Sequence, residues 1–219
     1  MWICERTMGS DSYNFKEEII EQIKKSAAIK EDIIKKHIDI INSIANRIIK
    51  AYTNNNKVIW FGNGGSAADA QHLSCELVSK FLLEREAIPS IALTTNTSIL
   101  TAISNDYTFE EVFKRQVEAF AEKGDILIGI TTSGTSPNII KALQSGKKKG
   151  TVNIAFTGKN TDKIKAFTDY LVDVPSKDVP RIQESHIMIG HIICNLVEKT
   201  LFGEQKWETK QYSSIETVQ

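Results

Sequence analysis

The chain contains few cysteines, and none of them are close together in the sequence. Cys4, Cys75 and Cys194 are the only three in 219 residues, and no C-x-x-C pair occurs. An odd number of cysteines at this spacing excludes a disulfide framework and a four-cysteine zinc site. We therefore expect a protein of the reducing cytoplasm.

The sequence also lacks an excess of charge and a long apolar run. Its 27 basic and 27 acidic residues leave no net charge, so no overall basic field is present to bind nucleic acid or an anionic membrane. No apolar run approaches the roughly 18 residues that a membrane span requires. The hydrophobic fraction of 41% and the charged fraction of 25% are those of a soluble, folded protein.

Short apolar runs alternate with helical patterns beyond residue 57. The runs cover residues 58–61, 88–93, 126–130, 152–156 and 170–174. Between them lie helical patterns at 66–81, at 97–103 with 109–121, at 137–148 and at 161–167. Fully apolar strands that alternate with helices are typical of a parallel sheet covered on both faces. The sequence therefore predicts an α/β fold with a doubly wound, five-stranded parallel sheet.

Helices are expected on both sides of this region. Two isoleucine-rich stripes, one from Phe15 to Ala27 and one from Ile34 to Tyr52, are separated by the charged Lys30-Glu31-Asp32. They predict an N-terminal helical pair whose apolar surface packs either on this chain or in a bundle shared between subunits, and its extent favours some sharing. A long C-terminal helix is predicted over 181–202. We expect a leader over 1–14 that is not a signal peptide and is disordered, one domain over 15–203, and a polar tail over 204–219.

The loop after the first predicted strand is rich in glycine. Phe61 is followed by Gly62, Asn63, Gly64, Gly65 and Ser66, and a helix begins there. The free amides of a helix N-terminus favour anions, and Ser66 is expected to cap the helix and to donate its hydroxyl. The loop is neither a Walker A motif nor G-x-G-x-x-G. By itself it is also compatible with a plain glycine turn.

The loop after the third predicted strand is rich in hydroxyl groups. It carries Thr131, Thr132, Ser133, Thr135 and Ser136, followed by Pro137 at the expected first turn of a helix, for which Ser136 is the expected cap. Such a cluster at a helix N-terminus is suited to phosphate. Neither loop contains Lys or Arg, so phosphate would be held by amides, hydroxyls and helix dipoles.

Three motifs carry a resemblance to a known family: G-N-G-G-S, T-T-S-G-T-S-P-N and the R-I-Q-E-S-H of the last helix. The chain resembles the sugar isomerase (SIS) domain family and, within it, the single-domain phosphoheptose isomerases. The resemblance implies a flavodoxin-like SIS fold, a homotetramer and no nucleotide cofactor. It implies an aldose-ketose isomerase that converts sedoheptulose 7-phosphate to D-glycero-D-manno-heptose 7-phosphate. That product would supply heptose for lipopolysaccharide, capsule or glycoprotein.

The same resemblance assigns the substrate-binding residues. They are Asn63, Gly64, Gly65 and Ser66 in the first loop, Thr131, Thr132, Ser133 and Ser136 in the second, the pair Asn105 and Asp106, and Gln183. Pro180 departs from the pattern of the heptose isomerases, which puts some substrate contacts in question but not the proton transfer. Ala67 and Ala68 are more similar to the residues of the non-catalytic relatives in that stretch.

Proton transfer through an enediol suits a carboxylate and a histidine. The resemblance implies Glu76 as the base and His191 as its acid partner. His72 precedes Glu76 by four residues, which places both on one helical face at a spacing that zinc ligands also use. The resemblance implies a zinc site made of His72, Glu76, Gln183 and His191. If Glu76 and His191 hold a metal, they are not free as base and acid in that state, and the sequence leaves this open. His186 is expected to be structural, and His37 is given no role.

Two alternatives remain from the sequence. One is a non-catalytic SIS protein that binds the replication initiator, and the other is a SIS isomerase of a different phosphosugar. The Glu76–His191 pair favours an enzyme, because the non-catalytic relatives are expected to lack it. The fold itself does not determine the substrate.

Overall fold

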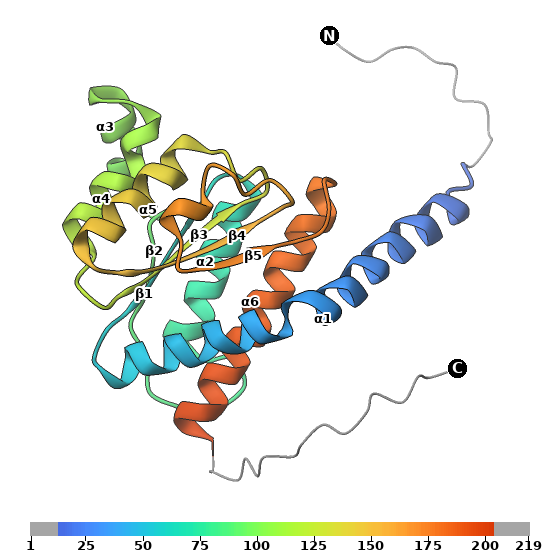
Figure 1. The fold of residues 1–219 in the computed structure, drawn as a ribbon, viewed down its shortest axis with the longest axis horizontal. Helices are drawn as coiled ribbons and strands as arrows, with labels where there is room; N and C mark the ends of the chain where they lie inside the picture. The colour runs from blue at the N-terminus through green and yellow to red at the C-terminus, as the bar shows by residue number, and fades with distance from the viewer. Residues whose placement is uncertain (1–12, 204–219) are drawn as a thin grey trace.

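The computed structural model describes residues 13–203, and its centre is a five-stranded sheet (Figure 1). All strands are parallel and lie in the order β2-β1-β3-β4-β5. Their bounds are Val58–Gly62 (β1), Ser90–Ala92 (β2), Ile126–Thr131 (β3), Val152–Thr157 (β4) and Tyr170–Asp173 (β5). The predicted doubly wound parallel sheet is confirmed.

Helices cover both faces of the sheet. Their bounds are Lys16–Thr53 (α1), Gly65–Val78 (α2), Thr97–Asp106 (α3), Val112–Phe120 (α4), Pro137–Lys149 (α5) and Val179–Phe202 (α6). Side chains alternate across a strand, so Trp60 and Phe156 pack with α1, α2 and α6, whereas Phe61 and Ala155 pack with α4 and α5. The sheet is therefore buried on both sides, as its continuous apolar runs indicate.

The predicted N-terminal helical pair is wrong: α1 is one helix of 38 residues. Lys30, Glu31 and Asp32 do not break it, because Lys and Glu are good helix formers and no Gly or Pro stands among them. Its N-terminal half extends beyond the rest of the molecule (Figure 1). The buried face passes through Ile33 and His37, which leaves Ile34 and Ile38 exposed at 52% and 54%, so the second predicted stripe is only partly buried.

Other boundaries differ locally. The helix predicted over 161–167 is only a short 3-10 helix, Lys165–Phe167, and a second one, Phe109–Glu111, precedes α4. The C-terminal helix α6 is present as predicted. Residues 1–12 of the predicted leader and the whole predicted tail lie outside the described residues.

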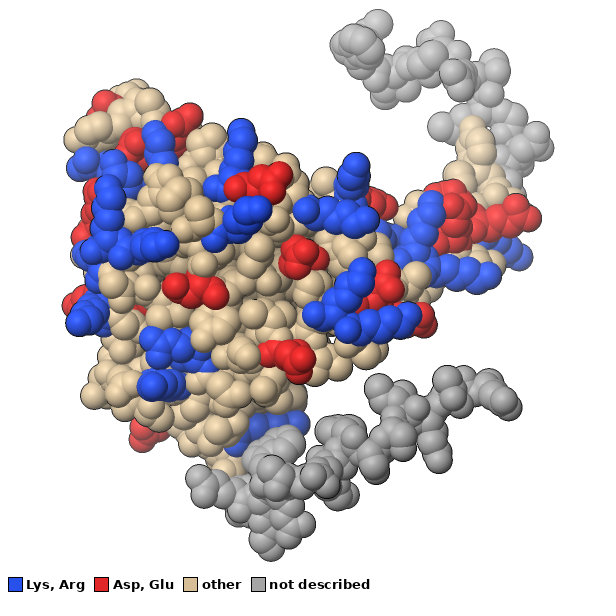
Figure 2. All heavy atoms as spheres, in the orientation of Figure 1, with Lys and Arg blue, Asp and Glu red and all other residues tan. Residues whose placement is uncertain are grey.

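The surface of the described residues mixes both signs of charge. Figure 2 shows Lys and Arg interspersed with Asp and Glu over the face in view, which agrees with a net charge of zero. Within residues 13–203, no helix combines the length and the apolar character needed to cross a membrane.

Candidate functional site

The two predicted anion loops lie side by side at the carboxyl edge of the sheet. They follow β1 and β3, which are neighbours in the sheet. A reciprocal amide pair joins them: Asn63 Nδ2 donates to Asn138 Oδ1 over 2.9 Å, and Asn138 Nδ2 donates to Asn63 Oδ1 over 2.8 Å. Asn138 is buried and also accepts from the Ile139 N–H. Asn63 is thus held by Asn138, a residue that the sequence analysis did not assign to the site.

The glycine loop turns sharply into α2. Gly64 has a φ of +56°, a backbone conformation that favours glycine, and α2 begins at Gly65. Ser66 is buried inside the first turn, and no side chain caps this helix, so the predicted capping role of Ser66 is wrong. Its position after the start of the helix frees its hydroxyl from capping.

Three hydroxyls converge in the second loop. Thr131 Oγ1 lies 3.3 Å from Ser133 Oγ and 3.1 Å from Ser136 Oγ, and the two serine oxygens are 3.5 Å apart. Ser136 occupies the N-cap position of α5 but makes no side-chain capping bond, so its hydroxyl faces the cluster instead. Gly134, with a φ of +65°, permits the turn.

A hollow of about 470 Å³ opens beside this hydroxyl cluster. Thr132 and Ser133 line it on one side, and Lys159 and Lys177 line it from the loops that follow β4 and β5. The two anion loops contain no basic residue, but the folded protein places two lysines next to the second one.

Helices α2 and α6 run side by side in the same direction. A β-carbon at Gly65 would collide with the Nε2 atom of Gln183, and one at Gly190 would collide with the Leu73 side chain. Further along, His72 meets His191. Gly190 therefore lets the two helices approach closely enough for the histidines to touch.

His72, Glu76 and His191 form a compact cluster. His72 Nε2 lies 2.9 Å from His191 Nε2 and 3.2 Å from Glu76 Oε1, and one ligand atom from each residue falls within 4.8 Å of the others. Two imidazole nitrogens and a carboxylate oxygen are ordinary zinc ligands, so this donor set fits a divalent metal. Cys194 is not a member of this cluster. It is buried, and burial raises the pKa of its thiol to about 12.

Asp69 lies one turn before His72 on α2. Burial raises the pKa of its carboxyl to about 6, an effect that the nearby His72 partly offsets. Its Oδ2 atom is buried and finds no hydrogen-bond partner among residues 13–203. In the sequence, only the i, i+3 spacing to His72 marks Asp69, which was not predicted as a site residue.

Other predicted site residues lie apart from this cluster. Asn105 and Asp106 end α3, are exposed, and hydrogen-bond to each other over 2.9 Å. Gln183 lies against Gly65 at the first loop, and its role as a metal ligand stays a prediction. His186 is buried with its Nε2 3.1 Å from the Thr157 carbonyl, as a structural residue would be, and His37 lies 3.0 Å from the Asp173 carbonyl.

The family model for the SIS domain matches residues 21–158, more than half of the chain. The phosphoheptose isomerase of Clostridium acetobutylicum is 54% identical over 186 residues, which cover 84% of this chain and 95% of that protein. Phosphoheptose isomerase 2 of Campylobacter jejuni is 52% identical over 181 residues, 82% of this chain and 90% of that protein.

Two solved structures are similar as well. The phosphoheptose isomerase of Neisseria gonorrhoeae superimposes with a TM-score of 0.80 at 36% identity, covering 85% of this chain and 100% of that one. The enzyme of Francisella tularensis superimposes with a TM-score of 0.82 at 32% identity and the same coverage.

Proposed function

The chain belongs to the SIS-domain family, to its phosphoheptose isomerases, and from this premise we propose that it converts sedoheptulose 7-phosphate to D-glycero-D-manno-heptose 7-phosphate. The observation that carries the proposal is the contact of His72, Glu76 and His191 on two helices whose first turns adjoin the anion loops. The product would supply heptose for lipopolysaccharide, capsule or glycoprotein.

The phosphate of the substrate is proposed to bind at the two loops. Hydroxyl groups come from Ser66, Thr131, Ser133 and Ser136. The N-termini of α2 and α5 supply amides and the positive ends of their helix dipoles. Thr132, with Lys159 and Lys177, lines the adjoining hollow. The first loop is shaped by Asn63, Gly64 and Gly65. The sugar is proposed to be contacted by Asn105, Asp106 and Gln183.

The spacing along α2 supports a phosphate at the far end of the sugar from the carbonyl. Ser66 and His72 are six residues apart on this helix, which corresponds to a rise of about 9 Å. A substrate that spans this distance binds its phosphate at the loops and its reacting carbons beside His72, where the Glu76 carboxylate also lies. A heptose phosphorylated on its last carbon has this form.

The proton transfers are assigned to Glu76 and His191. Glu76 removes the proton from carbon 1 of the ketose, and the enediol forms as the carbon 2 carbonyl oxygen takes up a proton. Glu76 then returns a proton to carbon 2 while the oxygen on carbon 1 loses its own, which leaves the aldose. His191 moves the proton between the two oxygens. In sum one hydrogen passes from carbon 1 to carbon 2 and one from oxygen 1 to oxygen 2.

Zinc is the proposed metal, held by His72, Glu76 and His191. Gln183 lies against Gly65 and stays a predicted fourth ligand. When bound, zinc would polarise the two oxygens between which the proton moves. A carboxylate has two oxygens, so Glu76 is able to contact a metal through one and to accept a proton through the other. His191 faces the cluster through its Nε2 atom, so it carries the proton between the two oxygens only while that nitrogen holds no metal.

The enzyme is proposed to be a cytoplasmic homotetramer. An apolar groove of about 530 Å³ lies between α1 and α6 and is lined by Ile33, Ile34, Ile38, Ile41, Met188, Ile192 and Leu196, among others. The half-exposed Ile34 and Ile38 leave apolar surface that a neighbouring subunit would cover. Light scattering at micromolar concentration tests this, and a monomer would contradict it.

The deciding experiment is incubation of the purified protein with sedoheptulose 7-phosphate while the aldose product is followed. Turnover by the wild type supports the proposal, and its absence refutes it. If another phosphosugar is isomerised instead, the assignment of the site stands and that of the substrate is wrong.

A further inference from the structure

One buried ion pair fastens the segment after α2 to helix α6. Arg85 belongs to the irregular segment 79–89, and Glu198 belongs to α6, yet their side chains are only 1% and 0% exposed. Arg85 Nε donates to Glu198 Oε1 over 2.9 Å. The pair is separated by 113 residues in sequence, so it joins two distant parts of the chain.

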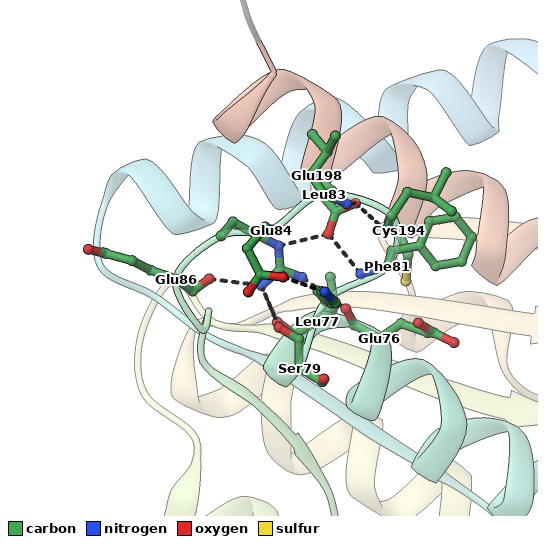
Figure 3. Close-up of polar contacts among 12 residues, drawn as sticks. Glu76, Leu77, Ser79, Phe81, Leu83, Glu84, Glu86, Cys194 and Glu198 are labelled. Atoms are coloured by element: carbon green, nitrogen blue, oxygen red, sulfur yellow. Dashed lines mark hydrogen bonds and ion pairs between the residues drawn. The ribbon is translucent and has the colours of Figure 1, made fainter.

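Glu198 also binds three consecutive backbone N–H groups. Phe81 donates to its carboxylate over 2.8 Å, Leu82 over 2.6 Å and Leu83 over 2.9 Å, and Figure 3 shows the carboxylate reaching from α6 into this segment. Burial alone would raise the pKa of Glu198, but the N–H groups of Leu82, Phe81 and Leu83 together with Arg85 bring it below its ordinary value. The carboxylate is thus ionised at neutral pH and holds the segment through charge-assisted hydrogen bonds.

Arg85 in turn binds the carboxyl end of α2. Its guanidinium donates to the carbonyl oxygens of Glu76 and Leu77, each over 2.9 Å, and to that of Ser79 over 3.3 Å. The last carbonyls of a helix have no partner within the helix, and a cation there also complements the negative end of the dipole. One of the carbonyls that Arg85 fixes belongs to Glu76, a member of the histidine–glutamate cluster.

The ion pair reaches the same cluster from a second side. Phe81, whose N–H is bound by Glu198, packs its ring against the imidazole of His191 with the centroids 5.6 Å apart. Glu198 follows His191 by seven residues on α6, which is about two turns and nearly the same face. Movement of this pair would therefore shift both Glu76 and the ring that supports His191.

We propose that the Arg85–Glu198 pair is a positioning device that sets the separation of α2 and α6 at the His72–Glu76–His191 cluster. This inference rests on the proposed function for its catalytic consequence. A buried ion pair is a weak contributor to net stability, since apolar residues of similar volume often serve as well. The hydrogen bonds of the Arg85–Glu198 pair are instead suited to holding the 79–89 segment and the end of α2 in one arrangement against α6.

The chain offers a matched control in a second buried carboxylate that binds backbone N–H groups and a basic side chain. Asp125 is buried, accepts from the N–H groups of Lys57 over 3.0 Å and Glu122 over 2.8 Å, and pairs with Lys57 Nζ at 2.7 Å. It stands immediately before β3, at the amino edge, whereas the anion loops follow the carboxyl ends of the strands. Asp125→Asn therefore disturbs a comparable buried carboxylate without touching α6 or the cluster.

The test compares Glu198→Gln and Asp125→Asn with the wild type. Cobalt(II) replaces zinc as a spectroscopic probe of the cluster, and its affinity is measured together with kcat, KM and the affinity for inorganic phosphate. We expect Glu198→Gln to lower cobalt affinity and kcat each about 10- to 100-fold, as the loss of a supporting partner of a metal ligand does. Phosphate affinity should change by less than about 2-fold, since the anion loops lie at the other end of α2. Asp125→Asn should leave cobalt affinity and kcat unchanged.

Unchanged cobalt affinity and kcat in Glu198→Gln would overturn the proposal, and so would equal losses in Asp125→Asn. If Glu198→Gln fails to fold, Arg85→Lys takes its place, because lysine keeps the charge but loses the planar fork of donors. The cobalt titration needs no substrate, so a wild type that is inactive on sedoheptulose 7-phosphate would refute the proposed function while the positioning role is still decided.

Discussion

The Nε2 atoms of His72 and His191 lie 2.9 Å apart, although 119 residues separate them in the chain. A hydrogen bond at this distance needs a proton on one ring nitrogen and a free lone pair on the other. Without that proton, both lone pairs face the same point, where the Glu76 carboxylate also lies. The cluster is therefore able to exchange a proton for a metal ion.

We predict that the purified protein contains about one zinc per subunit when no chelator is used. His72→Ala should lose this metal, because it removes the residue that contacts both other donors. Metal analysis measures the content, and His37→Gln, a buried histidine outside the cluster, should keep it. Metal-free protein with full activity would contradict the prediction.

Glu76→Gln should reduce kcat by about 10²- to 10⁴-fold, because the amide has no basic oxygen to accept the proton from carbon 1. KM should change little, since the phosphate loops are untouched. Steady-state kinetics with sedoheptulose 7-phosphate measures both. Glu84→Gln, an exposed carboxylate on the segment after α2, is the control and should behave as the wild type does. Undiminished turnover by Glu76→Gln would rule out its role as the base.

The amide pair that joins the two anion loops should control phosphate binding. Asn138→Ala removes both hydrogen bonds to Asn63 and leaves that amide without its partner. A lost buried hydrogen bond costs about 1–3 kcal/mol, so we expect KM and the dissociation constant for inorganic phosphate to rise about 10-fold. Calorimetric titration with phosphate measures this. Asn54→Ala, at an exposed helix end, is the control and should change neither value. An unchanged dissociation constant for phosphate in Asn138→Ala would show that the amide pair does not control phosphate binding.

The sequence carries enough information for the sheet and for part of the site. Strands such as Ile126–Thr131 are buried on both faces, so their apolar runs are continuous and their order along the chain predicts parallel pairing. Both anion loops could be predicted as ligand sites, because ligands of parallel sheets bind beyond the carboxyl ends of the strands. The His72–Glu76 relationship is visible because four residues make about one helical turn.

The relationships that the sequence did not reveal are those between distant residues. The Asn63–Asn138 pair spans 75 positions, and the Arg85–Glu198 pair spans 113. Nothing local marks Glu198 as buried, because a charged residue on a helix is usually exposed. The continuity of α1 was missed for the opposite reason: a charged triplet looks like a boundary, but its residues favour a helix and their neighbours on both sides are helical.

The buried His186 should make stability depend on pH. Burial lowers the pKa of His186 to about 4, although the hydrogen bond to the Thr157 carbonyl raises it in part. Its Nδ1 atom has no hydrogen-bond partner within residues 13–203, so a proton added there would find no acceptor among them. Because the folded pKa lies below the ordinary value of 6.5, the unfolded chain takes up the proton first as the pH falls. The stability that neutral His186 provides is thus complete above about pH 6.5 and is lost progressively between pH 6.5 and 4.

His186→Gln tests this directly, since glutamine is able to donate to the Thr157 carbonyl but does not titrate. Between pH 7 and pH 5 the wild type should lose about 2 kcal/mol more of its free energy of unfolding than His186→Gln does. Denaturant titrations at the two pH values and one protein concentration measure the difference. All other titrating groups, those of the His72 cluster included, are common to both proteins, so the comparison isolates His186. Equal losses in the two proteins would mean that the protonation of this histidine does not limit stability at acidic pH.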